Sequence, residues 1–468
     1  MLERLRRHGG LYFAVTLISR GSGVLGLPFF TRALTPAEYG TLEIVTIAII
    51  LVNLCAPLEI SQSVARNYQD QTPRGRSILL STAFWFTLVA CAGFFTITLA
   101  LFPPTSSIWR FLSPSERILP IVAVMGTINC LFYLLHNHFR WQLRPMAFAT
   151  VGLVQTLTGL LLAVYFGYVL KEGLEGVLVG QTIGLSAGLL LALYLHRQEI
   201  QLRASLKVLA ENLSFSVPLV PAGIAVWLAQ LSDRALLSWL GSLSDLGEYA
   251  VAARLAAIGS LALQGFQGAM TPLIYATYRD PETPSKIADI FRLFLGFALL
   301  CCFTLSVFSK EIINLLTDER YYAGSWLIPI LAPATLLFGM YIFAPGIAIA
   351  KRTGQQLKIN IVASAVSVAT NLALIPLLGA MGAAVASLLA ATIYFYGFVY
   401  YGQRHYPVPY KLAGFQYVAA VYIAGVLTSS LIEADSGTFL VIRFALCAIF
   451  GAMLWRWGYL KSTSPTKS

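Results

Sequence analysis

Long apolar runs separated by short polar segments make up most of this chain. A helix needs about 20 apolar residues to cross a hydrocarbon layer roughly 30 Å thick. The predicted spans are residues 11–30, 42–61, 78–102, 118–138, 146–170, 174–196, 213–241, 249–275, 290–309, 326–349, 359–378, 381–401, 414–432 and 438–458. The pattern therefore predicts an all-α polytopic membrane protein with about 14 transmembrane helices.

The positions of Lys and Arg test this count, because a missed span would invert the sidedness of everything after it. With the N-terminus inside, 22 of the 32 basic residues fall in inner segments, 6 in outer segments and 4 within spans. We therefore expect a multi-pass membrane protein with both termini cytoplasmic. This bias also accounts for the net charge of +11 without a nucleic-acid partner.

Composition removes several classes of function. Hydrophobic residues make up 57% of the chain and charged residues 11%, against about 25% charged in soluble domains. No Walker-type loop occurs in the sequence, and the segments between predicted spans are shorter than twenty residues. A membrane enzyme would need more room for paired acids and substrate positioning. We therefore expect no enzyme, no catalytic residue and no cofactor.

Two motifs do not support a site. All six cysteines lie in apolar spans, where free thiols behave as small hydrophobic groups. His136 and His138 have the wrong spacing for one helix face and no Cys or acidic cluster near them in sequence, so we expect both to be solvated at the membrane rim. The sequence therefore predicts neither disulfides nor a metal site.

The first span contains a charge at its centre. Arg20 lies in the middle of this run, where an arginine costs roughly 2.5–3.5 kcal/mol even on insertion scales. Three glycines and Pro28 in the same run lower its stiffness. We interpret the segment as a moving helix that lines a cavity, with Arg20 facing protein or water.

The chain contains an internal repeat. Around Glu38-Tyr39-Gly40 a span, a short outer loop and a second span follow one another, and the same order recurs around Glu248-Tyr249-Ala250. Both repeats start inside, so they are parallel, and a substrate site is expected between them. The predicted divisions are a six-helix lobe with a linker over 1–212, a second six-helix lobe over 213–405, and two accessory helices with a tail over 406–468.

Two features of the first lobe carry local predictions. Gly180, Gly184 and Gly188 stand four residues apart on one helix face, which predicts close packing against a neighbouring helix. The segment 195–212 is polar with leucines at intervals, which predicts an interfacial amphipathic helix that joins the halves.

Charged residues in the later spans leave alternatives open. Adjacent helical residues point about 100° apart, so Asp233 and Arg234 should not pair, and Asp233 invites a coupling cation or a distant basic partner. Arg254 either reaches the outer surface or lines the cavity. Arg443 is similarly placed near a span end, and we expect its side chain to extend to the membrane surface.

Polar residues in the first half form a second candidate set. Glu59 lies near the inner rim and is either solvated or paired with Arg20 or Arg66. Mid-span amides either join helices or line a polar path. These amides are Asn53, Asn129, Gln155 and Gln181.

Two blocks of sequence resemble a known family. Residues 29–40 and 232–255 are similar to the polysaccharide (oligosaccharide) flippases of the multidrug/oligosaccharidyl-lipid/polysaccharide exporter superfamily. The resemblance implies two six-helix lobes in a pseudo-twofold V plus two C-terminal helices, working by alternating access. It also implies an undecaprenyl-pyrophosphate-linked oligosaccharide as substrate, for O-antigen, capsule or exopolysaccharide synthesis, with polymerase and glycosyltransferase partners.

Related flippases of the lipid-linked peptidoglycan precursor line their cavity with basic residues. The corresponding positions here look like Arg20 and Arg254, although fewer basic residues lie near Gly26 and Pro28. Arginine suits a pyrophosphate because its planar fork stays protonated. The candidate pyrophosphate-binding residues are Arg20, Arg254, Arg32 and Arg66.

Three other functions compete with this one. An ion-coupled multidrug exporter of the same superfamily would use a proton or Na⁺ gradient and would want acids in the cavity. A membrane enzyme of polysaccharide assembly is disfavoured by the short loops, and a scaffold for synthases would leave Arg20 unexplained.

Overall fold

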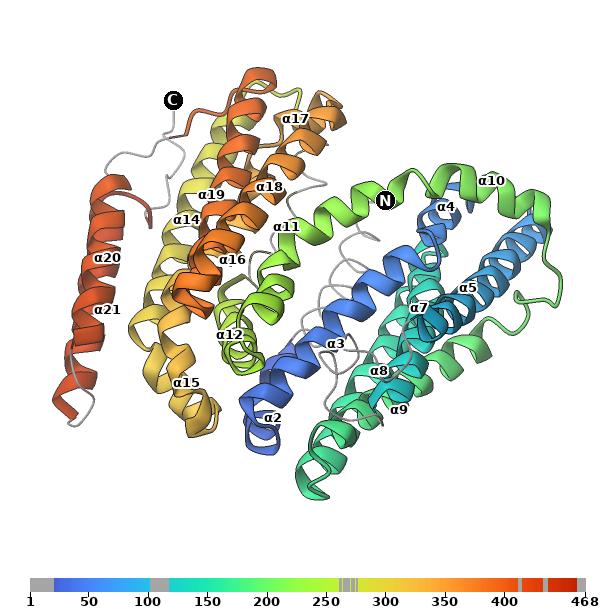
Figure 1. Cartoon of the computed structure of the whole chain (residues 1–468). Coiled ribbons are helices and arrows are strands. Elements are labelled where there is room, and N and C mark those ends of the chain that lie inside the picture. Colours follow the sequence, from blue (N-terminus) through green and yellow to red (C-terminus); the bar gives the residue numbers. More distant parts are fainter. Residues whose placement is uncertain are drawn as a thin grey trace. The chain divides into compact units, whose positions relative to one another are not determined.

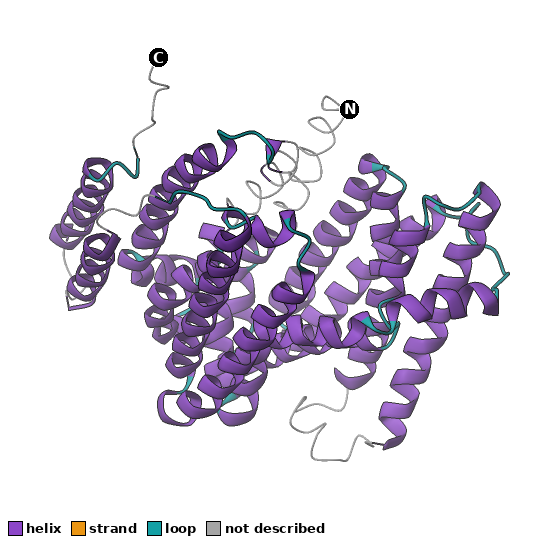
Figure 2. Cartoon of the chain, turned by 90° about the horizontal axis from the view of Figure 1, so that it is seen from above, coloured by secondary structure: helices purple, strands orange, loops and turns teal. Residues whose placement is uncertain are grey.

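A computed structural model describes residues 21–101, 118–260, 263, 270, 274, 277–410, 415–431 and 437–460. Every regular element in these ranges is helical (Figure 2). Within a hydrocarbon layer a helix satisfies its own backbone hydrogen bonds, which explains why long apolar runs adopt this structure. The predicted all-α fold class is confirmed. The chain divides into two units, residues 1–247 and 248–468 (Figure 1).

Unit 1 contains the helices of the first half and the start of the second. Its elements are α2 (Leu27–Ala33), α3 (Pro36–Cys55), α4 (Ile60–Asn67), α5 (Pro73–Leu101), α7 (Ile118–Trp141), α8 (Pro145–Val164), the π-helical η1 (Tyr165–Val169), α9 (Gly173–Leu195), α10 (Leu206–Ser216), α11 (Leu219–Leu240) and the first turn of α12 (Leu243–Ala256).

Unit 2 contains the rest of α12 and the C-terminal helices. Its further elements are α14 (Thr283–Val307), α15 (Ser309–Leu316), the 3₁₀-helical η2 (Glu319–Leu327), α16 (Ile328–Gly339), the 3₁₀-helical η3 (Met340–Phe343), α17 (Gly346–Ile349), α18 (Thr353–Leu378), α19 (Ala380–His405), α20 (Phe415–Leu431) and α21 (Gly437–Arg456).

Many of these helices have the dimensions of membrane spans. In the described residues nine are long and apolar enough to cross a membrane, or ten if the bent pair α10 and α11 counts as one span. A polytopic membrane protein is therefore supported, whereas the predicted total of fourteen spans is not confirmed. The three predicted lobe limits stay predictions.

Glycines hold α8 and α9 close together, as the sequence predicts. A Cβ atom on Gly180 would lie 2.3 Å from the backbone nitrogen of Ala163, and one on Gly184 would lie 2.3 Å from the Cα of Gly159. A Cβ on Gly188 would lie 2.7 Å from the Cβ of Gln155. Any larger side chain at these positions would force the helices apart.

The linker differs from its prediction. Residues 200–205 form no helix, and the amphipathic helix begins only at Leu206, where Ser205 caps α10. The extended stretch binds α5, because Ser81 Oγ accepts a 2.8 Å bond from the backbone N–H of Gln201 and Trp85 donates a 2.9 Å bond to the Gln201 carbonyl. These side chains satisfy backbone groups that a helix would have paired internally.

The two C-terminal helices pack against α14. The Phe303 and Phe450 rings stack with centroids 4.2 Å apart, which joins α14 to α21. Ser306 and Tyr422 share a 2.7 Å hydrogen bond between their hydroxyls, and Ser429 donates a 2.9 Å bond to the Val307 carbonyl. Aromatic packing and hydroxyl bonds of this kind replace the hydrophobic effect, which is absent between helices in lipid.

Candidate functional site

The helices α3 and α12 begin with the same local structure. Thr35 Oγ1 accepts a 3.3 Å bond from the Glu38 N–H, and the Glu38 carboxylate accepts a 2.8 Å bond from the Thr35 N–H. Ser242 and Asp245 repeat this exchange at 3.0 and 3.2 Å. Each pair forms a capping box that satisfies the free N–H groups of the first turn. The sequence therefore places two equivalent helix starts in unit 1.

The same two helices touch at equivalent glycines. A Cβ on Gly40 would lie 2.0 Å from the Leu243 carbonyl oxygen, and a Cβ on Gly247 would lie 1.9 Å from that of Pro36. Pro36 and Leu243 are the first residues of their helices, so the contact is reciprocal, as across a two-fold axis. Neither position can hold a side chain in this conformation.

This contact corrects the alignment of the repeat. By sequence, Glu38-Tyr39-Gly40 corresponds to Glu248-Tyr249-Ala250, but the cap and glycine positions align residues 35–40 with 242–247. The two alignments differ by three residues. The helix contact requires a capping residue at the helix start and a glycine five residues later, and the repeated Glu-Tyr pair does not occupy equivalent positions in this arrangement.

A buried ion pair lies one turn further along α3. Glu43 Oε1 is 3.1 Å from Arg234 Nη1 on α11, and the two side chains are 5% and 25% exposed. Asp233 is also buried, and its Oδ1 accepts a 2.8 Å bond from the backbone N–H of Arg234. Two acids and one base are thus held near the end of α11, in a setting that strengthens electrostatic interactions.

Glu43 is a residue that the sequence analysis missed. It is the second residue of a predicted span, a position at which an acidic side chain is expected to be solvated. Arg234 lies seven residues inside the predicted end of its own span, so the two predicted depths differ by roughly 9 Å and the sequence contains no signal of a pair. The structure brings the charges to one level because α3 begins at Pro36, six residues before the predicted span.

The candidate pyrophosphate-binding arginines do not form one cluster. Arg20 lies outside the described residues. Arg32 is exposed on α2, with Nη1 3.3 Å from the Pro28 carbonyl, and Arg66 on α4 lies 4.3 Å from the centre of the Phe215 ring. Because α2 and α4 lie at opposite ends of α3, a 20-residue helix about 30 Å long, Arg32 and Arg66 cannot hold one diphosphate in this conformation (Figure 1).

Arg254 has a different position. It is half-buried in the last turn of α12, within unit 2. The side chain is therefore neither fully withdrawn into the protein nor fully solvated, and its role stays a prediction.

Glu59 occupies an unusual backbone position between α3 and α4. Its φ of 53° is in the left-handed region, and its side chain is half-buried. Burial raises the pKa of Glu59 above its ordinary value, and a hydrogen bond from Gln62 opposes that rise in part. In the described part of the chain it forms no ion pair with Arg66.

The mid-span amides are spread over four helices of unit 1. Asn53 on α3 is half-buried, and its Oδ1 has no hydrogen-bond partner in the described residues. Asn129 is half-buried on α7. Gln155 accepts a 3.2 Å bond from Thr156 and lies with Gln181 at the glycine contact of α8 and α9.

Of the two histidines of α7, His138 is not solvated, contrary to the prediction, whereas His136 is half-buried. The His136 ring stacks between Phe132 and Phe148, with centroids 5.0 and 4.0 Å away. His138 is fully buried, and its Nε2 lies 3.5 Å from Glu199 Oε2. The His196 side chain at the end of α9 packs against His138, and no local sequence pattern predicts that contact.

Arg443 is also placed differently from its prediction. Its side chain is 1% exposed and forms an ion pair with Glu311 of α15 rather than extending to the membrane surface. An acid at the same end of a neighbouring helix compensates the charge, so the guanidinium has no need to reach water.

Comparisons with known proteins identify the family and the fold. Residues 29–325 match the model of a protein family described as polysaccharide biosynthesis protein. No curated protein matches the chain in sequence. The structure resembles lipid II flippase MurJ in an inward closed conformation, with a TM-score of 0.74 and 13% identity, over 95% of this chain and 99% of that chain.

Transporters of a second kind share the fold. An inward-facing multidrug resistance MATE family transporter of the MOP superfamily matches with a TM-score of 0.63 and 15% identity, over 82% of this chain and 94% of that chain. The outward-facing form of such a transporter matches with a TM-score of 0.59 and 15% identity, over 86% and 95%.

Proposed function

Because the chain belongs to the polysaccharide biosynthesis protein family, we propose that it is a flippase for undecaprenyl-pyrophosphate-linked oligosaccharides. The family match confirms the resemblance inferred from the two sequence blocks. In this proposal the protein moves its substrate from the inner to the outer leaflet of a bacterial inner membrane, for the synthesis of a surface polysaccharide. Both termini are cytoplasmic.

The observation that carries the proposal is the reciprocal contact of Gly40 and Gly247. It joins the first turns of two helices that are equivalent in the repeat, through backbone atoms alone. A contact without interlocked side chains can separate and re-form without rotamer changes. Alternating access requires such a reversible closure at one end of the pathway. The positive-inside pattern assigns this closure to the outer end.

Arginine supplies the chemistry that the substrate requires. A pyrophosphate must leave water to cross the bilayer, and a guanidinium can replace its hydration with two parallel hydrogen bonds. We assign this role to Arg20 and Arg254. No covalent step is needed, only a site that is open to each side in turn.

The alternative function is ion-coupled export of drugs. The buried acids Glu43 and Asp233 favour it, because carboxylates can take up a proton or a sodium ion. The flippase is the preferred assignment, because Glu43 is already neutralised by Arg234 at 3.1 Å. In either case a proton or Na⁺ gradient is the proposed energy source, with Asp233 as its candidate ligand.

The experiment that tests the function measures glycan export in a strain that depends on this gene. Arg20→Ala and Arg254→Ala should each abolish surface glycan and leave the lipid-linked oligosaccharide on the inner leaflet. Arg279→Ala, an exposed arginine on a predicted inner loop, serves as the control. Normal export by either variant would remove that arginine from the site.

The same strain distinguishes the two functions. Gradient collapse should stop export if Asp233 binds a coupling ion, and export that survives collapse of both gradients would exclude this role. If loss of the gene abolished drug efflux and left the surface glycan unchanged, the protein would be an ion-coupled drug exporter instead. A lipid-linked sugar co-purified with the protein, together with a polymerase or glycosyltransferase, would support the flippase.

A further inference from the structure

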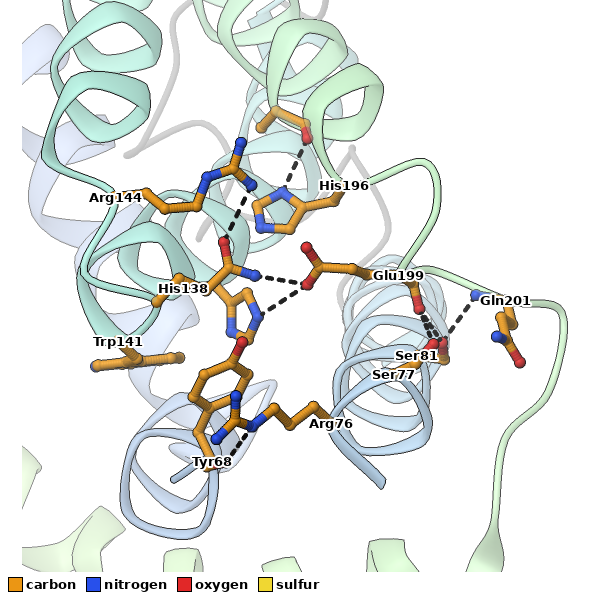
Figure 3. A network of polar contacts seen from close by, with 12 residues as sticks. Tyr68, Arg76, Ser77, Ser81, His138, Trp141, Arg144, His196, Glu199 and Gln201 are labelled. Atoms are coloured by element: carbon orange, nitrogen blue, oxygen red, sulfur yellow. Dashed lines mark hydrogen bonds and ion pairs between the residues drawn. The ribbon is translucent and has the colours of Figure 1, made fainter. Parts of the chain in front are cut away.

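Three side chains of the metal-binding type meet where α7 and α9 end. His138 comes from the last turn of α7, His196 follows the last residue of α9, and Glu199 lies three residues later (Figure 3). One nitrogen or oxygen atom from each lies within 4.8 Å of the others. The two imidazoles are fully buried, and the carboxylate is about one-third exposed.

The ring of His196 is oriented by its own helix. Nδ1 lies 2.9 Å from the Ala192 carbonyl, a contact that requires the proton on Nδ1 (Figure 3). Nε2 therefore carries the lone pair, and this buried atom has no hydrogen-bond partner in the described residues. A histidine that donates one N–H to a carbonyl and presents the other nitrogen bare has the arrangement of a metal ligand.

His138 is equally short of partners. Both of its ring nitrogens are buried without a hydrogen bond in the part of the chain that the structure describes. The 3.5 Å contact with Glu199 is long for a hydrogen bond. Buried polar groups are normally satisfied, so unsatisfied nitrogens beside a carboxylate require an explanation.

A second layer of contacts positions the carboxylate. Gln142 Nε2 donates a 2.5 Å bond to Glu199 Oε2, and Arg144 donates a 3.4 Å bond to the Gln142 oxygen. The Glu199 carbonyl accepts bonds from Ser77 and Ser81 of α5. Helix α5 and the turn between α7 and α8 thus hold this one residue in place. Such support is what metal ligands need in order to keep their geometry.

Aromatic rings surround the histidines. The Tyr68 and Trp141 rings lie edge-on to His138, with centroids 4.8 and 5.8 Å away (Figure 3). The Phe139 ring lies 4.2 Å from that of His196. This wall restricts water on one side and leaves the carboxylate side more open.

We propose that His138, His196 and Glu199 bind one Zn²⁺ ion, with water as a fourth ligand. Two imidazoles and one carboxylate are a common zinc ligand set, and nitrogen donors disfavour Mg²⁺ and Ca²⁺. Ligands about 2.0 Å from a tetrahedral zinc lie roughly 3.3 Å apart, so shifts of about 1 Å would close the site.

The position of the site gives the ion a structural role. Residues 197–205 leave α9, run along α5 and lead to α10, so Glu199 is the first firm attachment of this linker. A bound ion would join the start of the linker to the end of α7. Zinc would therefore rigidify the predicted cytoplasmic end of unit 1, whether or not the protein is a flippase.

The test is metal titration of the full chain, purified in detergent, with any histidine tag removed and metal stripped by a chelator. Zn²⁺ should bind at one equivalent and raise the melting temperature, and Co²⁺ should give the visible absorption of a tetrahedral site with nitrogen ligands. His196→Ala and Glu199→Gln should lose both signals. His405→Ala, an exposed histidine that contacts Gln355 at 2.9 Å, should keep them.

A further variant separates ligand loss from misfolding. Gln142→Ala keeps all three ligands and should weaken zinc binding about 10–100-fold. If the ligand variants fail to fold, the wild-type cobalt spectrum and the zinc affinity of Gln142→Ala still test whether the site binds metal. The proposal would be overturned if the wild type took up no stoichiometric metal or if His196→Ala took up as much as the wild type. The remaining role of these residues would then be the contact between His138 and Glu199.

Discussion

Glu43 of α3 and Arg234 of α11 form an ion pair of 3.1 Å inside unit 1. Glu43 is almost completely enclosed, and this pair places a positive charge beside its carboxylate. The pair connects a helix of the first predicted repeat with the first helix of the second. A paired acid is a poor ligand for a coupling ion, so Asp233 rather than Glu43 is the candidate ligand for such an ion.

Removing one member of this pair should destabilise the protein. Arg234→Gln should lower the free energy of unfolding by about 3 kcal/mol, because the almost completely enclosed Glu43 carboxylate loses this ion pair. Glu43→Gln should cost less, because the Arg234 side chain is 25% exposed. The double variant should recover much of that loss. Denaturant unfolding in detergent measures all three. Glu282→Gln, which breaks an exposed pair with Lys286, is the control and should change little.

Side chains at the glycine contact should disturb both stability and export. Gly40→Ala and Gly247→Ala each introduce a Cβ within 2.0 Å of a carbonyl oxygen, so α3 and α12 must move apart. We expect a loss of about 1–3 kcal/mol and impaired export. Gly93→Ala is the matched control, because nothing lies within 4 Å of its Cβ position. Unchanged stability and export in both contact variants would show that the helices are not held together here.

Glu59 should make stability depend on pH. Its folded-state pKa is raised by burial, so the folded state binds a proton more tightly than the unfolded state. Stability is therefore greatest at low pH and falls as pH rises through the raised value. Glu59→Gln should remove this component and stabilise the protein near neutral pH. Melting temperatures between pH 4.5 and 7.5 test the slope, with the exposed Glu211→Gln as control.

The ion pair of Arg443 and Glu311 should hold α21 to unit 2. Arg443→Gln should leave the Glu311 carboxylate without its partner and cost roughly 3 kcal/mol, whereas Arg443→Lys should retain part of the interaction. Proteolysis between α20 and α21 would detect a loosened helix. If Arg443→Gln melts like the wild type, the side chain reaches the membrane surface after all, as the sequence analysis expects.

Several features could be predicted from single segments of sequence. The apolar runs predicted helices, and the four-residue spacing of Gly180, Gly184 and Gly188 predicted the close contact of α8 with α9. The predicted repeat placed two equivalent helix starts near their observed positions, but its alignment differs by three residues from that of the caps. The sequence contains a repeated Glu-Tyr pair, whereas the equivalent positions in the structure are the helix caps Thr35 and Ser242.

Side-chain partners could not be predicted in the same way. Arg443 is expected to reach the membrane surface because it lies near a span end, and His138 is expected to be solvated because no Cys or acidic cluster lies near it in sequence. Their partners Glu311 and Glu199 lie on other helices. Arg20, on which the transport proposal depends, lies outside the described residues.

By itself, the sequence determined that this protein has many helices long and apolar enough to cross a membrane and that it belongs to the polysaccharide biosynthesis protein family. Hydrophobic length, charge bias and family motifs are properties of contiguous segments, so they can be read along one chain. Only the tertiary structure decided which charges meet, which glycines touch and where histidines are buried. Those outcomes depend on how helices distant in sequence pack, and packing brings together residues that no local pattern connects.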